Sequence, residues 1–144
     1  MPLRSAVAIP FTTEALKSTL ERLESEYWAY QEKRDREAVF GYLSAVFETV
    51  AWWYHVGRAK EYAQQALRLQ RAPVPKITDP FAILIFATTD RAKVDFRTRS
   101  KWARVLRFAK VFKDADESLI DFIGRRGGIN KCARRYARLL GQNS

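Results

Sequence analysis

The sequence is poor in the residues that make disulfides, metal sites and imidazole-dependent active sites. Among its 144 residues there is one Cys, Cys132, and one His, His55. A single Cys cannot form an internal disulfide or a Cys-based zinc site, and a single His excludes any site that needs two imidazoles. The lone Cys and the lack of a secretory signal within residues 1–11 lead us to expect a reducing, cytoplasmic location.

Long apolar runs and recognisable catalytic motifs are also missing. The most apolar window, residues 80–87, is far shorter than the roughly 20 residues that a membrane helix requires, so we expect no membrane partner. The sequence has no Gly-rich phosphate loop, no cluster with metal-ligand spacing and no Ser/His/Asp set. We therefore expect a protein that is not an enzyme, with no catalytic residue, no metal site and no cofactor.

Positive charge is concentrated in the last third of the chain. Residues 91–144 contain 15 basic and five acidic residues, which accounts for the whole net charge of +10. Residues 1–90 hold 11 basic and 11 acidic residues and are neutral. A charge this unevenly distributed attracts polyanions, so the basic third is the expected binding region.

Composition and periodicity predict an all-α fold. Apolar residues make up 47% and charged residues 29% of the chain, as in globular proteins. We expect an N-terminal helical hairpin or long helix, followed by a compact bundle of about four short helices. A Pro-rich linker at 73–79 would separate a neutral amphipathic part, residues 1–72, from a basic helical part, residues 80–144.

The first helix is expected to follow an extended lead-in at residues 1–11. It would begin at Thr12 or Thr13, whose hydroxyl can cap it, with Glu14 in its first turn. Its apolar seam is Leu16, Leu20, Leu23, Tyr27 and Tyr30. We expect this seam to pack against the next helix; the alternative is a homodimer formed through residues 13–70.

A charged stretch at 33–37 interrupts the seam. On a continuous helix, the apolar stripe beyond it would lie roughly opposite the first seam. That stripe is Val39, Leu43, Val46, Val50 and Trp53 or Tyr54. The change of side is explained by a break near Asp35, which we favour, or by one long helix that changes its partner. The second helix is then expected to run to about Gln70, before the prolines.

A dense aromatic cluster, Trp52 to His55, falls within this second helix. Aromatic side chains bury large areas, so we expect the cluster to belong to the core. Four consecutive residues cannot all face one core, and the alternative is a partner-docking or base-stacking surface that includes Trp52, Trp53 and Tyr54. His55 has no catalytic partner at helical spacing.

Asp79 and Pro80 predict the start of a third helix, because Asp caps a helix and Pro is tolerated at its first position. Residues 82–86 also have strand-like propensity, and a hairpin with 92–96 is the alternative. A basic helix is then expected at about 97–112. Its apolar side would be Trp102, Val105, Leu106, Ala109 and Phe112, and its basic side Lys101, Arg104, Arg107 and Lys110.

Two short helices are expected to complete the chain. Residues 114–118 would cap the first, whose apolar side is Leu119, Ile120, Phe122 and Ile123. Gly127 and Gly128 would end it, and a final helix, capped by Gly141, would follow. The buried side of that helix would be Cys132, Ala133, Tyr136, Ala137 and Leu140, and its basic side Lys131, Arg134, Arg135 and Arg138.

A helix, a glycine turn and a second helix rich in Arg and Ala resemble a helix-turn-helix unit. The run Gly127-Gly128-Ile129-Asn130-Lys131 is similar to the Gly-Gly-Asn-Lys turn that opens recognition helices in Fis-like DNA-binding regions, with Ile129 standing between the glycines and Asn130. The resemblance covers residues 119–141. It implies a DNA-binding unit whose second helix enters the major groove.

We therefore expect a non-enzymatic protein that binds nucleic acid, DNA rather than RNA, as a small regulator or nucleoid-associated factor. The alternative is an adaptor or inhibitor that docks on an acidic, nucleic-acid-handling protein. The candidate nucleic-acid-binding residues are Arg97, Arg99, Lys101, Arg104, Arg107, Arg125, Arg126, Lys131, Arg134, Arg135 and Arg138. Most would neutralise phosphates, and Lys131 or Arg134 would reach base edges.

Overall fold

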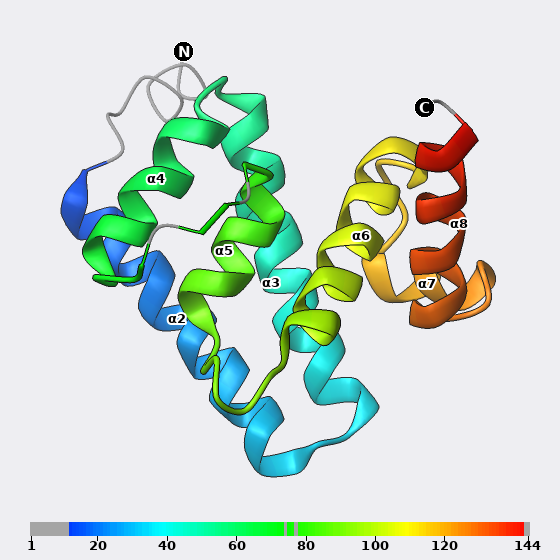
Figure 1. The fold of residues 1–144 in the computed structure, drawn as a ribbon, viewed down its shortest axis with the longest axis horizontal. Helices are drawn as coiled ribbons and strands as arrows, with labels where there is room; N and C mark the ends of the chain where they lie inside the picture. The colour runs from blue at the N-terminus through cyan, green and yellow to red at the C-terminus, as the bar shows by residue number, and fades with distance from the viewer. Residues whose placement is uncertain (1–11, 74, 77, 143–144) are drawn as a thin grey trace.

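The computed structural model describes residues 12–73, 75–76 and 78–142, and this part of the chain is helical with no strand (Figure 1). The predicted all-α fold is confirmed there. The predicted lead-in at 1–11 lies outside the described residues. The helices are α2 Thr13–Lys33, α3 Arg36–His55, α4 Ala59–Leu69, α5 Pro80–Thr88, α6 Phe96–Phe112, α7 Leu119–Arg125 and α8 Ile129–Gln142.

Helices α2 and α3 form the hairpin that the change of apolar side predicted. Arg34 ends α2 in the left-handed conformation, with φ of 55°, and Asp35 caps α3 by accepting a hydrogen bond from the Ala38 amide. The seam of α2 from Leu16 to Tyr27 is buried, and α2 packs along α3. The expected packing of the seam within one chain is therefore confirmed.

The second helix is shorter than predicted, because a break near Gly57 divides it into α3 and α4. Gly57 adopts φ of 76°, a conformation that costs Gly little and other residues more. The chain turns there, and α4 begins two residues later at Ala59. Periodicity continued across this turn, so the sequence pattern alone did not separate the two helices.

Helix α5 begins as predicted and excludes the alternative hairpin. The Asp79 carboxylate accepts a hydrogen bond from the Ala82 amide, and Pro80 occupies the first helical position. Nearly all of α5 is buried, since it contacts α2, α3, α4 and α6. Among the described helices, none is both long and apolar enough to span a membrane.

Helices α6, α7 and α8 form one end of the molecule, and α2, α4 and α5 form the other (Figure 1). Helix α3 contacts both groups, whereas α8 packs on α6 and α7. The end formed by α6 to α8 carries 13 of the 26 basic residues but only four of the 16 acidic residues. The division of the chain at 73–79 into two parts stays a prediction.

The last two helices correct two details of the sequence analysis. Gly141 lies inside α8 and does not cap it. The buried side of α8 includes Cys132, Ala133 and the half-buried Leu139, whereas Ala137 and Leu140 are exposed. Helix α8 packs mainly on α6, and this contact buries a side of α8 that is rotated from the expected one.

Candidate nucleic-acid interface

A short glycine turn sets the position of α8 relative to α7. Ser118 caps α7 by accepting a hydrogen bond from the Asp121 amide, and the turn that follows spans residues 126–128. Gly127 and Gly128 adopt φ of 97° and 104°, which other residues rarely reach. A Cβ on Gly127 would also lie 2.5 Å from Cδ of Lys131, so this side chain lies against the bare turn.

Six basic side chains meet in one groove beside this turn. The groove has a volume of about 420 Å³ and is lined by Gly127 and by Arg125, Arg126, Lys131, Arg134, Arg135 and Arg138. These are all of the charged residues from Phe122 to the end of the sequence, and none is acidic. We call this surface the basic groove. Its lining lacks a negative charge, so anions of suitable size are attracted there.

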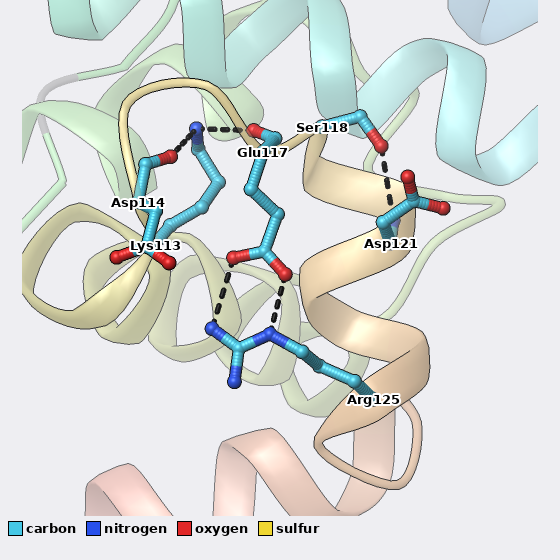
Figure 2. Close-up of polar contacts among 6 residues, drawn as sticks. All are labelled: Lys113, Asp114, Glu117, Ser118, Asp121 and Arg125. Atoms are coloured by element: carbon cyan, nitrogen blue, oxygen red, sulfur yellow. Dashed lines mark hydrogen bonds and ion pairs between the residues drawn. The ribbon is translucent and has the colours of Figure 1, made fainter.

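One acid stands beside the basic groove and binds Arg125. Glu117 receives two hydrogen bonds from the Arg125 guanidinium, one of them 2.9 Å long from Nη2 to Oε1 (Figure 2). Nζ of Lys113 donates to the carbonyl oxygens of Asp114 and Glu117, which holds the loop before α7. The guanidinium lowers the pKa of Glu117 and the carboxylate raises the pKa of Arg125, so both groups stay charged.

Arg126 is fixed by aromatic packing. Its guanidinium carbon lies 5.4 to 5.7 Å from the ring centroids of Phe108, Phe112 and Phe122. Its Nε is buried and has no hydrogen-bond partner among the described residues. Arg126, Arg135 and Arg138 also line a smaller hollow of about 240 Å³ with Phe108, Phe112 and Leu139. The basic groove therefore has an apolar rim on the side of α6.

The basic residues of α6 do not form a free face. Arg99, Arg104 and Arg107 line a second cleft, between α5 and α6. Arg107 lies 3.8 Å from Asp79 and over the ring of Tyr136, and Lys110 lies 4.3 Å from the ring centroid of Tyr54. Arg107 and Lys110 hold helices together through these contacts. They are therefore less available to a partner than the basic face predicted for α6 implied.

The candidate basic residues thus separate into three groups. Arg125, Arg126, Lys131, Arg134, Arg135 and Arg138 share the basic groove, and Arg99, Arg104 and Arg107 share the cleft on α6. Arg97 and Lys101 line neither. Phe112, which was predicted to lie on the apolar side of α6, is 40% exposed. Phe108 is the buried phenylalanine of α6.

The aromatic cluster is divided between the core and the surface. Trp53 is fully buried and its ring contacts that of Tyr62, whereas Trp52 and Tyr54 are about two-fifths exposed. Of the three residues considered for partner docking, only Trp52 and Tyr54 therefore reach the surface. His55 is exposed, with its ring 5.5 Å from that of Trp52.

Cys132 is the small buried residue that its place in α8 predicted. Its side chain is fully buried, and burial raises the pKa of its thiol although the charges of Arg126 and Arg135 oppose this. A thiol with a raised pKa is a poor nucleophile. The part of the chain that the structure describes contains no group of three or more His, Cys, Asp or Glu side chains placed to hold a metal ion.

The residues that support these surfaces from a distance carry no motif in the sequence. Glu117 was assigned to a cap, and its eight-residue separation from Arg125 spans a loop and a helix. The sequence signal available was only that Glu117 is the last acid before α7 in a basic segment. Comparison with protein-family models, with curated proteins and with solved structures found no match for this chain.

Proposed function

We propose that this protein binds duplex DNA through the basic groove, as a small regulator or nucleoid-associated factor. The observation that carries the proposal is the convergence of six basic side chains from α7, the glycine turn and α8. Duplex DNA presents a phosphate about every 1.7 Å along its axis, and each phosphate that is neutralised releases bound counterions. A groove with several cations and no acid in its lining suits such a partner.

The dimensions of α8 support a helix that meets a DNA groove. Its 14 residues give a length of about 21 Å at 1.5 Å per residue, and the major groove, about 12 Å wide, admits one α-helix. Asn130, Lys131 and Arg134 are exposed near the start of α8. In a helix-turn-helix unit this is the part of the second helix that reaches base edges. Arg125 ends α7 and Arg126 begins the turn, and both would contact phosphates.

The proposal is tested by replacing three groove residues together. In Arg134→Ala/Arg135→Ala/Arg138→Ala, α8 should persist, because these side chains are exposed and Ala favours helix. Binding to a labelled 20-base-pair duplex is measured by fluorescence anisotropy at several salt concentrations. The slope of log K against log salt is negative, and its magnitude should fall by about 2 to 3 units relative to the unmodified protein, since each phosphate contact contributes about 0.9.

A matched control removes the same charge elsewhere. Lys17, Lys60 and Arg68 are exposed on α2 and α4, at the other end of the molecule. Their triple Ala variant should bind the duplex with a slope within about half a unit of the unmodified protein. Equal losses for both triple variants would leave only a general effect of net charge and would contradict a defined interface.

A second candidate function is supported by Trp52, which is 41% exposed although it is large and apolar. Trp and Arg dominate the energetic centres of protein interfaces. In this alternative the protein is an adaptor or inhibitor whose basic groove and Trp52 dock an acidic partner protein. Duplex affinity that shows no salt dependence, or no duplex binding at all, would favour it over DNA binding.

A further inference from the structure

The cleft between α5 and α6 has the size and lining of a small-molecule site. Its volume is about 530 Å³, within the range of roughly 300 to 1,000 Å³ that such sites have. Phe86 and Phe96 contribute apolar surface, and Phe96 is 68% exposed at the first position of α6. An exposed aromatic ring at the edge of a cleft offers a face on which a planar ligand can stack.

Four cations line the same cleft: Lys76, Arg99, Arg104 and Arg107. Arg99 and Arg107 are engaged, Arg99 with the carbonyl oxygen of Val94 and Arg107 with Asp79. Arg104, between them on α6, has a buried Nε with no hydrogen-bond partner among the described residues. The Arg104 side chain lines the cleft and its guanidinium forms no ion pair among the described residues, so its charge is available to an anionic ligand in the cleft.

Asp79 adds an acceptor to this otherwise basic lining. Its Oδ2 accepts the hydrogen bond that caps α5, while Oδ1 lies 3.8 Å from Nε of Arg107, beyond hydrogen-bond distance. The Asp79 side chain is only 16% exposed. Oδ1 therefore retains the capacity to accept a hydrogen bond from a hydroxyl or amino group of a ligand.

We propose that the α5–α6 cleft binds a mononucleotide, with the phosphate at Arg104, the base on Phe96, and Asp79 accepting a hydrogen bond from the sugar or base. The three features that carry the assignment are the charge of Arg104, the exposed ring of Phe96 and the Oδ1 atom of Asp79, which Arg107 approaches only to 3.8 Å. This site is separate from the basic groove, and neither site requires the other. Arg107 links the cleft to α8, because it lies 3.8 Å from Asp79 in the cleft and over the ring of Tyr136 on α8.

The probe is AMP, titrated into the full-length protein by isothermal titration calorimetry, with adenosine and inorganic phosphate in separate titrations. AMP should bind more tightly than either fragment. Arg104→Ala should weaken AMP binding by at least about tenfold, the effect expected when a charged hydrogen bond is lost. Arg97→Ala is the matched control: it removes the same charge from an exposed position of α6 outside the cleft and should change affinity by less than about twofold.

Phe96→Ala gives a second test that does not endanger the fold, since the ring is mostly exposed. It should weaken AMP and adenosine binding by at least about fivefold and leave phosphate binding unchanged. The assignment is overturned if AMP does not bind the folded protein, if phosphate alone binds as well as AMP, or if Arg97→Ala and Arg104→Ala weaken AMP binding equally.

The same variants separate this inference from the proposed DNA binding. The triple variant of Arg134, Arg135 and Arg138 should lose duplex affinity and keep AMP affinity, because none of the three lines the cleft. Loss of AMP binding in that variant would contradict a separate site. AMP binding without duplex binding in the unmodified protein would refute the proposed function alone, and duplex binding without AMP binding would refute this inference alone.

Discussion

The guanidinium of Arg107 on α6 lies over the ring of Tyr136 on α8, with its carbon 5.0 Å from the ring centroid. Arg107 also lies 3.8 Å from Asp79, the residue that caps α5. A single side chain thus links three helices that are separate in sequence. The position of α8, and of the basic groove on it, depends on this link as well as on the glycine turn.

Replacing Tyr136 with Leu should loosen the attachment of α8. A cation–π contact of this kind contributes about 0.5 to 1 kcal/mol at partly exposed sites, and Tyr136→Leu should lower the free energy of unfolding by that amount. Tyr136→Phe keeps the ring and should remain within about 0.3 kcal/mol of the unmodified protein. Urea denaturation followed by circular dichroism measures both, and equal losses would show that the ring does not act through Arg107.

Single substitutions in the basic groove should distinguish phosphate contacts from base reading. Arg134→Ala and Arg135→Ala should each reduce the magnitude of the salt slope by about one unit or less and weaken binding similarly on all duplexes. Lys131→Ala, at the start of α8, should cost about 1 to 3 kcal/mol on a selected duplex and little on random ones. Titrations against both kinds of duplex provide the comparison, and uniform losses for Lys131→Ala would indicate a non-specific binder.

Glu117→Gln should strengthen duplex binding, because it removes the negative charge that Arg125 neutralises (Figure 2). The magnitude of the salt slope should rise by up to about one unit as Arg125 becomes available to a phosphate. Arg125→Ala should have the opposite effect. Anisotropy titrations at several salt concentrations test the pair of variants, and weaker binding by Glu117→Gln would mean that the ion pair supports the groove.

The same ion pair gives a pH dependence of defined sign. Arg125 lowers the pKa of Glu117 in the folded protein below its ordinary value. The pair therefore stabilises the fold above the ordinary pKa of Glu, and this contribution is lost as the pH falls through the lowered pKa. Glu117→Gln should abolish that part of the acid dependence when unfolding is followed from about pH 6 down to about pH 3.

Asp79 and Asp95 should respond to pH with opposite signs, although both cap helices. Burial raises the pKa of Asp79, so its ionisation opposes folding, and this cost grows as the pH rises from the ordinary Asp pKa through the raised one. Hydrogen bonds from Thr98 lower the pKa of Asp95, so its ionised form stabilises the fold at neutral pH and this stability is lost in acid.

Asn substitutions test this difference, since Asn also caps helices well. At neutral pH Asp79→Asn should leave the free energy of unfolding unchanged or higher, and Asp95→Asn should lower it. Urea denaturation at neutral and acidic pH provides the measurement. If the two variants lose equal stability at neutral pH, the burial of Asp79 carries no electrostatic cost.

Local sequence determined where several helices begin. Thr12, Asp79 and Ser118 each accept a hydrogen bond from an amide three residues ahead, and such contacts depend only on neighbouring residues. The left-handed turn at Gly127 and Gly128 is local for the same reason. The break at Gly57 was missed because one Gly within a helical pattern is compatible with both a continued and an interrupted helix.

Tertiary packing decided which side chains are available to a partner. Trp52 and Trp53 are adjacent and chemically alike, yet only Trp53 is buried, because α3 presents that position to the core. Arg107 and Arg134 both belong to basic helix faces in the sequence, but only Arg107 lies against Asp79 and Tyr136. Periodicity predicts that a helix has two sides, whereas burial and charge pairing depend on which distant residues lie opposite each side, and that is a property of the fold.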